Sequence, residues 1–351
     1  MLKVKNISKK LGDFSLQDIN FEVAKGDYFV LLGISGAGKS LLLEMIAGLT
    51  QPCSGQIFLE DKEITNEKIQ KRPIGLVFQD AAIFPHLSVY ENIAFPLKCK
   101  KISKTKIDET VKSIAADTNI LHLLQRKPET LSGGEKQRVA IARTLAMQPK
   151  CLLLDEPLAS LDVQLKNDFR ALLRKINRNG QTIIHVTHDY KEAISLANRI
   201  GVLENGTISQ VASPDEVFHH PKTEFVANFV GIKNFFAGSL VENQNGEKQF
   251  RTSNISLVLL TNEQQGDGFI IIKNEDILFS EQPNKLNSIN LFEGEIIDIE
   301  PTKMKLEINI DIGIKLAVLV NKTALENYNL AIGQKIWTQI NPDTIQFFRN
   351  G

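Results

Sequence analysis

Residues 33–40 read Gly33-Ile34-Ser35-Gly36-Ala37-Gly38-Lys39-Ser40, and they follow an apolar run from Tyr28 to Leu32. The apolar run predicts a buried strand, and the residues from about Lys39 to Ala47 predict a helix. Glycines between a strand and a helix let backbone amides surround a phosphate, while Lys39 neutralises its charge and the Ser40 hydroxyl ligates Mg²⁺. The stretch therefore predicts an α/β fold with a phosphate-binding loop at a strand end.

A second helix start of similar chemistry lies further along the chain, in Leu131-Ser132-Gly133-Gly134-Glu135. Ser132 and Glu135 have the spacing of a capping box, so we expect a helix to begin at the two glycines. Its free N–H groups and positive dipole end would face an anion. One nucleotide needs only one such cradle, so the sequence predicts two half-sites for phosphate.

Two carboxylates end another apolar strand, in Cys151-Leu152-Leu153-Leu154-Asp155-Glu156. Parallel sheets place their ligands at such strand ends. Asp155 suits the Mg²⁺ shell, and Glu156 can orient a water for in-line attack on a γ-phosphate. The pair predicts phosphoryl-transfer chemistry.

Two further polar residues follow predicted strands. His188 follows the strand from Thr182 to Val186, and we expect it to contact the γ-phosphate. Gln79 follows the strand from Ile74 to Phe78, where its amide oxygen can touch Mg²⁺ or water. Taken alone, Gln79 is an ordinary polar strand end. His185, inside its strand, is predicted to be a core histidine with satisfied hydrogen bonds.

The composition bounds the class of protein. A length of 351 residues suggests roughly two domains. The balance of 41 basic and 41 acidic residues argues against a surface built mainly to hold nucleic acid. The N-terminus carries charges where a secretory signal is apolar, and no run approaches the roughly 18 apolar residues of a membrane span. Three scattered cysteines, Cys53, Cys99 and Cys151, predict buried thiols rather than a disulfide framework or a zinc site.

The pattern of elements changes along the chain. The first 210 residues or so alternate strands with helices, after a β-rich opening, and a charged helical insertion runs from Ser103 to Arg126. After about Gly231 the chain consists of short alternating strands, which predict a second, all-β domain. Within it, residues 234–238 resemble 290–294 and residues 272–279 resemble 340–347, which predicts two similar β-units.

In their order, the motifs resemble those of ATP-binding cassette (ABC) ATPases. They correspond to Walker A at Gly33 to Ser40, the Q-loop at Gln79, the signature at Leu131 to Glu135, Walker B ending in Asp155-Glu156, the D-loop Ser160-Leu161-Asp162 and the switch histidine His188. The resemblance implies ATP and Mg²⁺ as cofactors, with Glu156, His188 and Gln79 as catalytic residues. It also implies a head-to-tail dimer, in which the signature of one copy completes the ATP site formed by Walker A of the other.

The resemblance extends to the importer branch of this family. The stretch from Val77 to Ile93 is similar to the segment by which importer ATPases meet their permease, and residues 214–231 are similar to the link into a C-terminal domain. That domain resembles the paired TOBE or MOP modules. Residues 10–16 and 28–32 look most like molybdate and tungstate importer ATPases. Iron, sulfate, sugars and polyamines remain alternative substrates.

The implied architecture is a P-loop cassette at residues 1–230, with a helical subdomain at about 85–150. An all-β, OB-like domain follows at 231–351, with units at about 232–282 and 286–351. The implied place is the cytoplasmic face of the membrane, beside a separate permease and, indirectly, an external binding protein. A soluble, non-transport ABC ATPase is the remote alternative, and intact Glu156 and His188 argue against an inactive regulatory cassette.

The chain departs from the family pattern at three places. Importers usually stack an aromatic residue on adenine, but this chain has Leu11, with Phe14 three residues later. Walker A has Ile34 where proline is frequent. Oxyanion-binding modules open their second unit with a Ser-Ala-Arg-Asn stretch, which here reads Ser288-Ile289-Asn290 without arginine, and the lysine expected after Ile340 is absent too. An oxyanion in the C-terminal domain would depend on backbone and hydroxyl donors.

Overall fold

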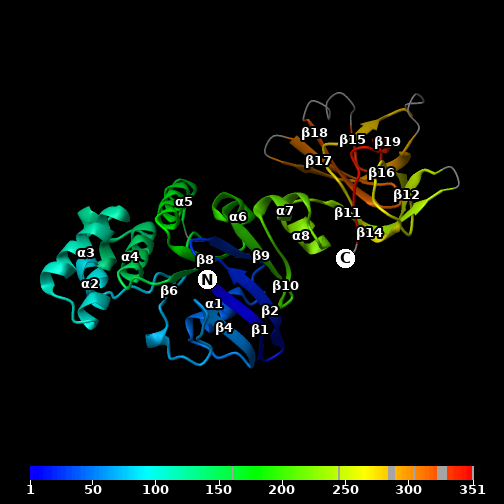
Figure 1. Ribbon diagram of the computed structural model, residues 1–351. Helices are drawn as coiled ribbons and strands as arrows, with labels where there is room; N and C mark the ends of the chain where they lie inside the picture. The colour runs from blue at the N-terminus through cyan, green and yellow to red at the C-terminus, as the bar shows by residue number, and fades with distance from the viewer. Residues whose placement is uncertain (160, 244–245, 284–288, 303–304, 322–329, 350–351) are drawn as a thin grey trace. The chain divides into compact units, whose positions relative to one another are not determined.

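The computed structural model describes the chain except for residues 160, 244–245, 284–288, 303–304, 322–329 and 350–351 (Figure 1). The chain divides into two compact units, Met1–His219 and His220–Gly351. This division lies before the predicted boundary at residue 230, because helix α8, Glu224–Phe229, packs on the first strand of the second unit.

A six-stranded sheet forms the centre of the first unit, in the order β10-β9-β3-β8-β7-β6. Its strands are β3 (Tyr28–Leu32), β6 (Ile74–Val77), β7 (Cys151–Asp155), β8 (Thr182–Thr187), β9 (Arg199–Glu204) and β10 (Thr207–Ala212). All neighbours pair in parallel except β10, which is antiparallel to β9. Every residue of β3 and β8 is buried, as expected for central parallel strands. The α/β prediction is confirmed.

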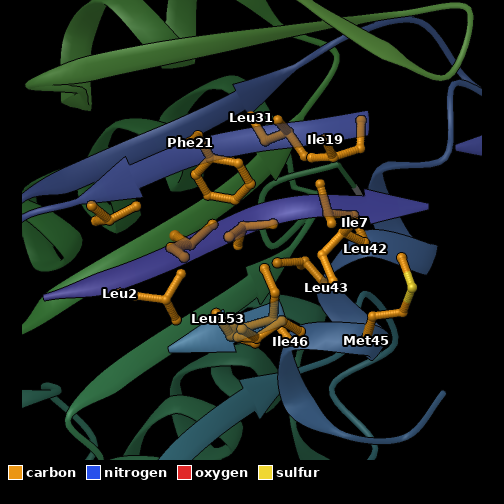
Figure 2. Packing of buried hydrophobic residues seen from close by; sticks show 14 of the residues in the cluster. Leu2, Ile7, Ile19, Phe21, Leu31, Leu42, Leu43, Met45, Ile46 and Leu153 are labelled. Atoms are coloured by element: carbon orange, nitrogen blue, oxygen red, sulfur yellow. The ribbon is translucent and has the colours of Figure 1, made fainter. Parts of the chain in front are cut away.

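A four-stranded antiparallel sheet, in the order β2-β1-β4-β5, packs on this centre. Its strands are β1 (Leu2–Leu11), β2 (Phe14–Val23), β4 (Ser54–Leu59) and β5 (Lys62–Glu63). Figure 2 shows the shared core, in which Leu2 and Ile7 of β1 face Leu43 and Ile46 of helix α1 (Lys39–Ala47). This packing fixes the helix that follows the glycine-rich loop.

The remaining helices of the first unit flank the sheets. They are α2 (Val89–Cys99), α3 (Lys104–Asp117), α4 (Gly133–Leu145), α5 (Val163–Arg178), α6 (Tyr190–Leu196) and α7 (Pro214–His219), with short 3₁₀ turns at Ile69–Lys71, Leu121–Leu123 and Pro128–Thr130. Helices α2, α3 and α4 share a core of their own, separate from the core of the sheets. The signature helix therefore belongs to a helical cluster inserted between β6 and β7.

The cysteine prediction is wrong for two of the three residues. Cys151 is buried at the start of β7, and its burial raises the pKa of the thiol to about 12. Cys53 and Cys99 are exposed, because one lies in the loop before β4 and the other ends α2 on its solvent face.

After helix α8, the described strands of the second unit form two five-stranded sheets, as the all-β prediction for residues 231–351 requires. Their orders are β13-β12-β11-β14-β20 and β15-β19-β16-β17-β18. The strands are β11 (Asn234–Glu242), β12 (Lys248–Arg251), β13 (Ser256–Val258), β14 (Gly266–Ile272), β15 (Ile277–Ser280), β16 (Leu291–Pro301), β17 (Lys305–Asp311), β18 (Lys315–Asn321), β19 (Lys335–Ile340) and β20 (Gln346–Arg349).

The two sheets are built alike but exchange their last strands. Strand β15 follows the first four strands along the chain yet pairs with β19, and β20 follows the second four yet pairs with β14. The repeated segments 272–279 and 340–347 contribute residues to these exchanged pairs. Ile277 of the first segment pairs with Ile340 of the second, and Phe347 of the second pairs with Ile270 of β14. Neither sequence repeat therefore forms a sheet by itself.

Candidate functional site: a nucleotide site at the strand ends

The glycine-rich loop joins β3 to α1, and its glycines are required by close contacts. A Cβ on Gly33 would lie 2.5 Å from the carbonyl oxygen of Leu203, and Gly38 has a φ of 97°. Lys39 is 5% exposed, and its Nζ donates to the carbonyl oxygens of Gly33 and Ile34 at 2.9 and 2.8 Å. Burial lowers the pKa of Lys39, while Glu156 and Asp155 act to raise it. The ammonium group is thus held inside the loop and faces two carboxylates.

Ser40 and Asp155 meet where α1 begins and β7 ends. The Ser40 hydroxyl donates to Oδ1 of Asp155 at 3.0 Å. Burial raises the pKa of Asp155, this hydrogen bond lowers it, and the charge of Glu156 raises it again. Among the described residues no group of three or more His, Cys, Asp and Glu side chains is arranged to hold a metal. A hydroxyl and one carboxylate fit Mg²⁺ that takes its other ligands from phosphates and water.

Glu156 and His188 come together although they follow different strands. Nδ1 of His188 lies 3.1 Å from Oε1 of Glu156. Glu156 has a φ of 42°, a left-handed conformation that is uncommon outside glycine, and its N–H donates to Val186 at 3.0 Å. The unusual backbone turns the Glu156 side chain toward the end of β8. His188 remains half exposed, so a ligand can reach the pair.

Gln79 is exposed just beyond the end of β6. The backbone carbonyl oxygen of Gln79 accepts a 2.5 Å hydrogen bond from Nε2 of Gln137, a buried residue of α4. Arg143, further along α4, donates to the carbonyl oxygen of Ala82 and stacks over Phe84. The signature helix therefore holds the Q-loop. Sequence reasoning missed Gln137, whose only signal is its place six residues after Leu131 on a helix face that turns inward.

The signature forms a helix start with the predicted caps. Ser132 is the N-cap of α4, its Oγ accepts from the N–H of Glu135 at 3.3 Å, and its own N–H donates to Oε2 of Glu135 at 2.7 Å. Leu131 is buried, whereas Ser132 and Gly133 are exposed. A Cβ on Gly133 would meet only open space, while Gly134 packs near Leu161. The start of α4 is thus anchored on one side and open to a ligand on the other.

The remaining predicted residues lie around the loop. Asp162 caps α5 by accepting from the N–H of Leu165 at 2.9 Å. Ser160 and Ser288 lie outside the described residues. Leu11 is 61% exposed and pairs across a tight turn with Phe14. The Phe14 ring packs on Gly38, where a Cβ would come within 2.6 Å of it. Phe14 therefore packs against the phosphate loop at Gly38, whereas the Leu11 side chain faces solvent.

His185 is buried, as predicted, but not fully satisfied. Its Nδ1 lies 2.9 Å from the Tyr28 hydroxyl, whereas its Nε2 has no hydrogen-bond partner within the described part of the chain. Burial lowers the pKa of His185 to about 3. The prediction of a satisfied histidine is therefore wrong at Nε2.

Comparison with known proteins identifies this set of motifs. Residues 16–159 match the ABC transporter family model. The chain is 41% identical, over 99% of its length and 100% of the relative's, to a molybdate/tungstate import ATP-binding protein of Pyrococcus abyssi. It is 44% identical, over 69% of its length and 66% of the relative's, to a spermidine/putrescine import ATP-binding protein of Thermotoga maritima.

A solved structure agrees with these relatives. An ATP-binding cassette, solved as a dimer in a post-hydrolysis state with ADP and phosphate, matches with a TM-score of 0.55 and 32% identity. The match covers 61% of this chain and 99% of that one. No helix in the described ranges is long and apolar enough to cross a membrane. The chain belongs to the ABC transporter family, as the nucleotide-binding, ATP-hydrolysing subunit of an importer.

Proposed function

We propose that two copies of the chain bind two Mg-ATP molecules head to tail and that ATP hydrolysis drives a separate membrane permease. The observation that carries this proposal is the Glu156–His188 contact of 3.1 Å beside the Ser40–Asp155 contact of 3.0 Å. One pair can activate water, and the other can hold the metal. The dimer of the solved relative supports the pairing of two copies.

In this proposal each residue has one task. Lys39 binds the β- and γ-phosphates, Glu156 orients and polarises the attacking water, and His188 holds the γ-phosphate geometry. Bound Mg²⁺ supplies charge neutralisation, and Ser40, Asp155 and Gln79 would hold it. The exposed start of α4, at Ser132 and Gly133, contacts the γ-phosphate in the partner copy's loop. Leu11 makes aliphatic contact with adenine.

Replacing Glu156 with Gln tests the catalytic role. We expect ATP turnover to fall by about a hundredfold or more, because the amide cannot accept a proton from water. ATP binding should persist, and gel filtration in ATP should show a trapped dimer. Glu109, an exposed residue of α3, offers a matched control, and E109Q should turn over normally. Undiminished turnover by E156Q would remove Glu156 from the mechanism.

We further propose that the solute is an oxyanion such as molybdate or tungstate, taken from an external binding protein at the outer face, with this chain peripheral on the cytoplasmic face. The support is the higher identity over the full length: 41% over 99% of the chain to the molybdate/tungstate relative, against 34% over 99% of the chain to a spermidine/putrescine import ATP-binding protein of Clostridium acetobutylicum. Uptake by the assembled transporter, challenged with molybdate, tungstate, sulfate, ferric iron, maltose and spermidine, tests this. Competition by spermidine but not by molybdate would overturn it.

A further inference from the structure

A buried polar cluster lies behind the strand end that carries His188, and the proposed mechanism does not use it. Its members are Tyr28 of β3, His185 and Thr187 of β8, and Glu192 of α6. Each is nine-tenths or more buried. Groups of this kind cost free energy to bury unless they are paired, so their pairing shows what they hold in place.

Thr187 is the centre of the cluster. Its hydroxyl donates to Oε2 of Glu192 at 2.8 Å and accepts from the N–H of Asp189 at 3.0 Å. Asp189 in turn caps α6 through the N–H of Lys191 at 2.8 Å. His188 therefore lies between two residues whose positions are tied to one buried carboxylate.

The carboxylate of Glu192 is only partly compensated. Burial raises its pKa, and the Thr187 hydrogen bond and the cations of α5 lower it. Nζ of Lys166 is 3.9 Å from Oε1, and Nε of Arg170 is buried without a hydrogen-bond partner in the described structure. Because well-packed apolar residues often replace such a cluster at no loss of stability, stability alone gives no reason for it.

His185 extends the cluster to Tyr28, at the end of β3 opposite the phosphate loop. With its pKa lowered to about 3, its ring is neutral. Nδ1 of His185 lies 2.9 Å from the Tyr28 hydroxyl, and Nε2 lies 3.6 Å from Oε2 of Glu192. Tyr28 begins β3, the strand that ends at Leu32 and leads into the phosphate loop at Gly33. The cluster thus joins the two strands that carry the phosphate loop and the switch histidine.

We propose that Glu192 is a positioning residue for ATP hydrolysis, which through the Thr187 hydroxyl fixes the backbone on both sides of His188 and so the contact of His188 with Glu156. This inference rests on the proposed role of the Glu156–His188 pair. It assigns to α6 a part in setting the geometry of water attack, without any contact between Glu192 and ATP.

Replacing Thr187 with Val removes the hydroxyl and keeps the shape. At a temperature well below unfolding we expect kcat to fall by about tenfold or more, with the ATP dissociation constant changed less than about threefold, because misplacement affects the chemical step. T187S, which keeps the hydroxyl, should stay within about threefold of the native kcat. Thr144 offers a matched control, since it is buried in α4 and donates to Ala140. T144V should turn over normally. Native kcat in T187V would overturn the proposal.

A double variant separates positioning from stability. Thr187→Val with Glu192→Met makes both partners apolar, which leaves no orphaned carboxylate, so its thermal midpoint should exceed that of T187V. Its kcat should stay as low as that of T187V. Recovery of kcat together with the midpoint would show a purely structural role and overturn the proposal. E156Q, measured in parallel, tests the proposed function separately: normal turnover there removes the pair itself, whatever T187V does.

Discussion

The two units of the chain use their buried polar groups in different ways. In the first unit three buried side-chain atoms lack a hydrogen-bond partner among the described residues: Oε1 of Gln137, Nε of Arg170 and Nε2 of His185. No described residue of the second unit has such an atom. Unsatisfied polar atoms cost stability, so their concentration beside the strand ends and the Q-loop marks the unit whose geometry serves chemistry.

In the second unit, buried asparagine side chains form hydrogen bonds that hold strands together. Asn234 forms two hydrogen bonds with the backbone of Ala317, and Asn290 forms two with the backbone of Val258. Ala317 lies in β18 and Val258 in β13, strands that hold corresponding edge places in the two sheets. Asn234 is the first residue of the central strand β11, and Asn290 immediately precedes the central strand β16. Each Asn binds the edge strand of the other sheet. These two pairs of hydrogen bonds, Asn234 with Ala317 and Asn290 with Val258, are called the polar clamps below, and they link the two sheets at equivalent places.

The largest expected effect comes from Ser132→Arg, which places a bulky cation at the exposed start of α4. We expect turnover to fall by about a hundredfold or more, because the side chain blocks closure of the dimer on ATP, whereas ATP binding to the single chain should persist. Turnover and nucleotide binding measured on the same preparation check this.

Ser213 provides the control for the lost cap. It forms the same capping box with Glu216, at the start of α7. S213R should lose a similar helix-capping free energy of about 1 kcal/mol and keep its turnover. Equal losses of turnover in S132R and S213R would show that capping, and not contact with a partner's nucleotide, explains the signature.

A smaller effect is expected from breaking the clamps of the second unit. Asn234→Ala or Asn290→Ala orphans a backbone N–H and C=O in each case, which should destabilise that unit by about 2–4 kcal/mol without changing ATP turnover. Hydrogen exchange on the full chain measures this destabilisation as a loss of protection at the amides of Ala317 and Val258. Asn254, exposed and bonded to Gly313, gives the control, because N254A should cost only about 0.5 kcal/mol.

The two clamps also test each other. Their similar geometry predicts similar losses of protection, one centred on β18 and the other on β13. If one variant lost protection and the other kept it, the sheets would not be equivalent and the repeat would be one of sequence alone.

Much of the first unit follows from local pattern. The strand from Tyr28, the helix from Lys39 to Ala47 and the box of Ser132 with Glu135 each depend on neighbours within a few residues, and all are confirmed. Local pattern fails where a partner is distant. The bond from Gln137 to Gln79 joins residues far apart in sequence, and only the packing of α4 on the Q-loop brings them together.

The second unit shows the same limit on a larger scale. The similarity of residues 272–279 to 340–347 predicts a repeat, but strand period says nothing about which sheet β15 joins. The exchange of β15 and β20 depends on long-range pairing. At the site, Thr187 and Glu192 read as an ordinary strand end and an ordinary helical residue, and only their buried contact gives them a candidate role.

The smallest expected effect concerns the free energy of unfolding contributed by Asp155, at the end of β7. Burial and the charges of Glu156 and Glu44 raise the pKa of Asp155, so the folded chain binds this proton more tightly than the unfolded chain. The stability contributed by the protonated form is therefore present below the unfolded pKa of about 3.9 and is lost as the pH rises through the raised folded value. Asp155→Asn should make the metal-free chain more stable than the native chain at pH 7, with the difference shrinking toward pH 4. The amide can still accept from Ser40.

Mg-ATP should raise the unfolding midpoint of the native chain and not of the Asp155→Asn variant. Asp117, exposed and paired with Lys175, is the control, and D117N should change stability by about 0.5 kcal/mol at most. Denaturant unfolding at both pH values decides the matter. A D155N chain less stable than native at pH 7 would mean that this strand end, like the clamps of the second unit, is built for the fold.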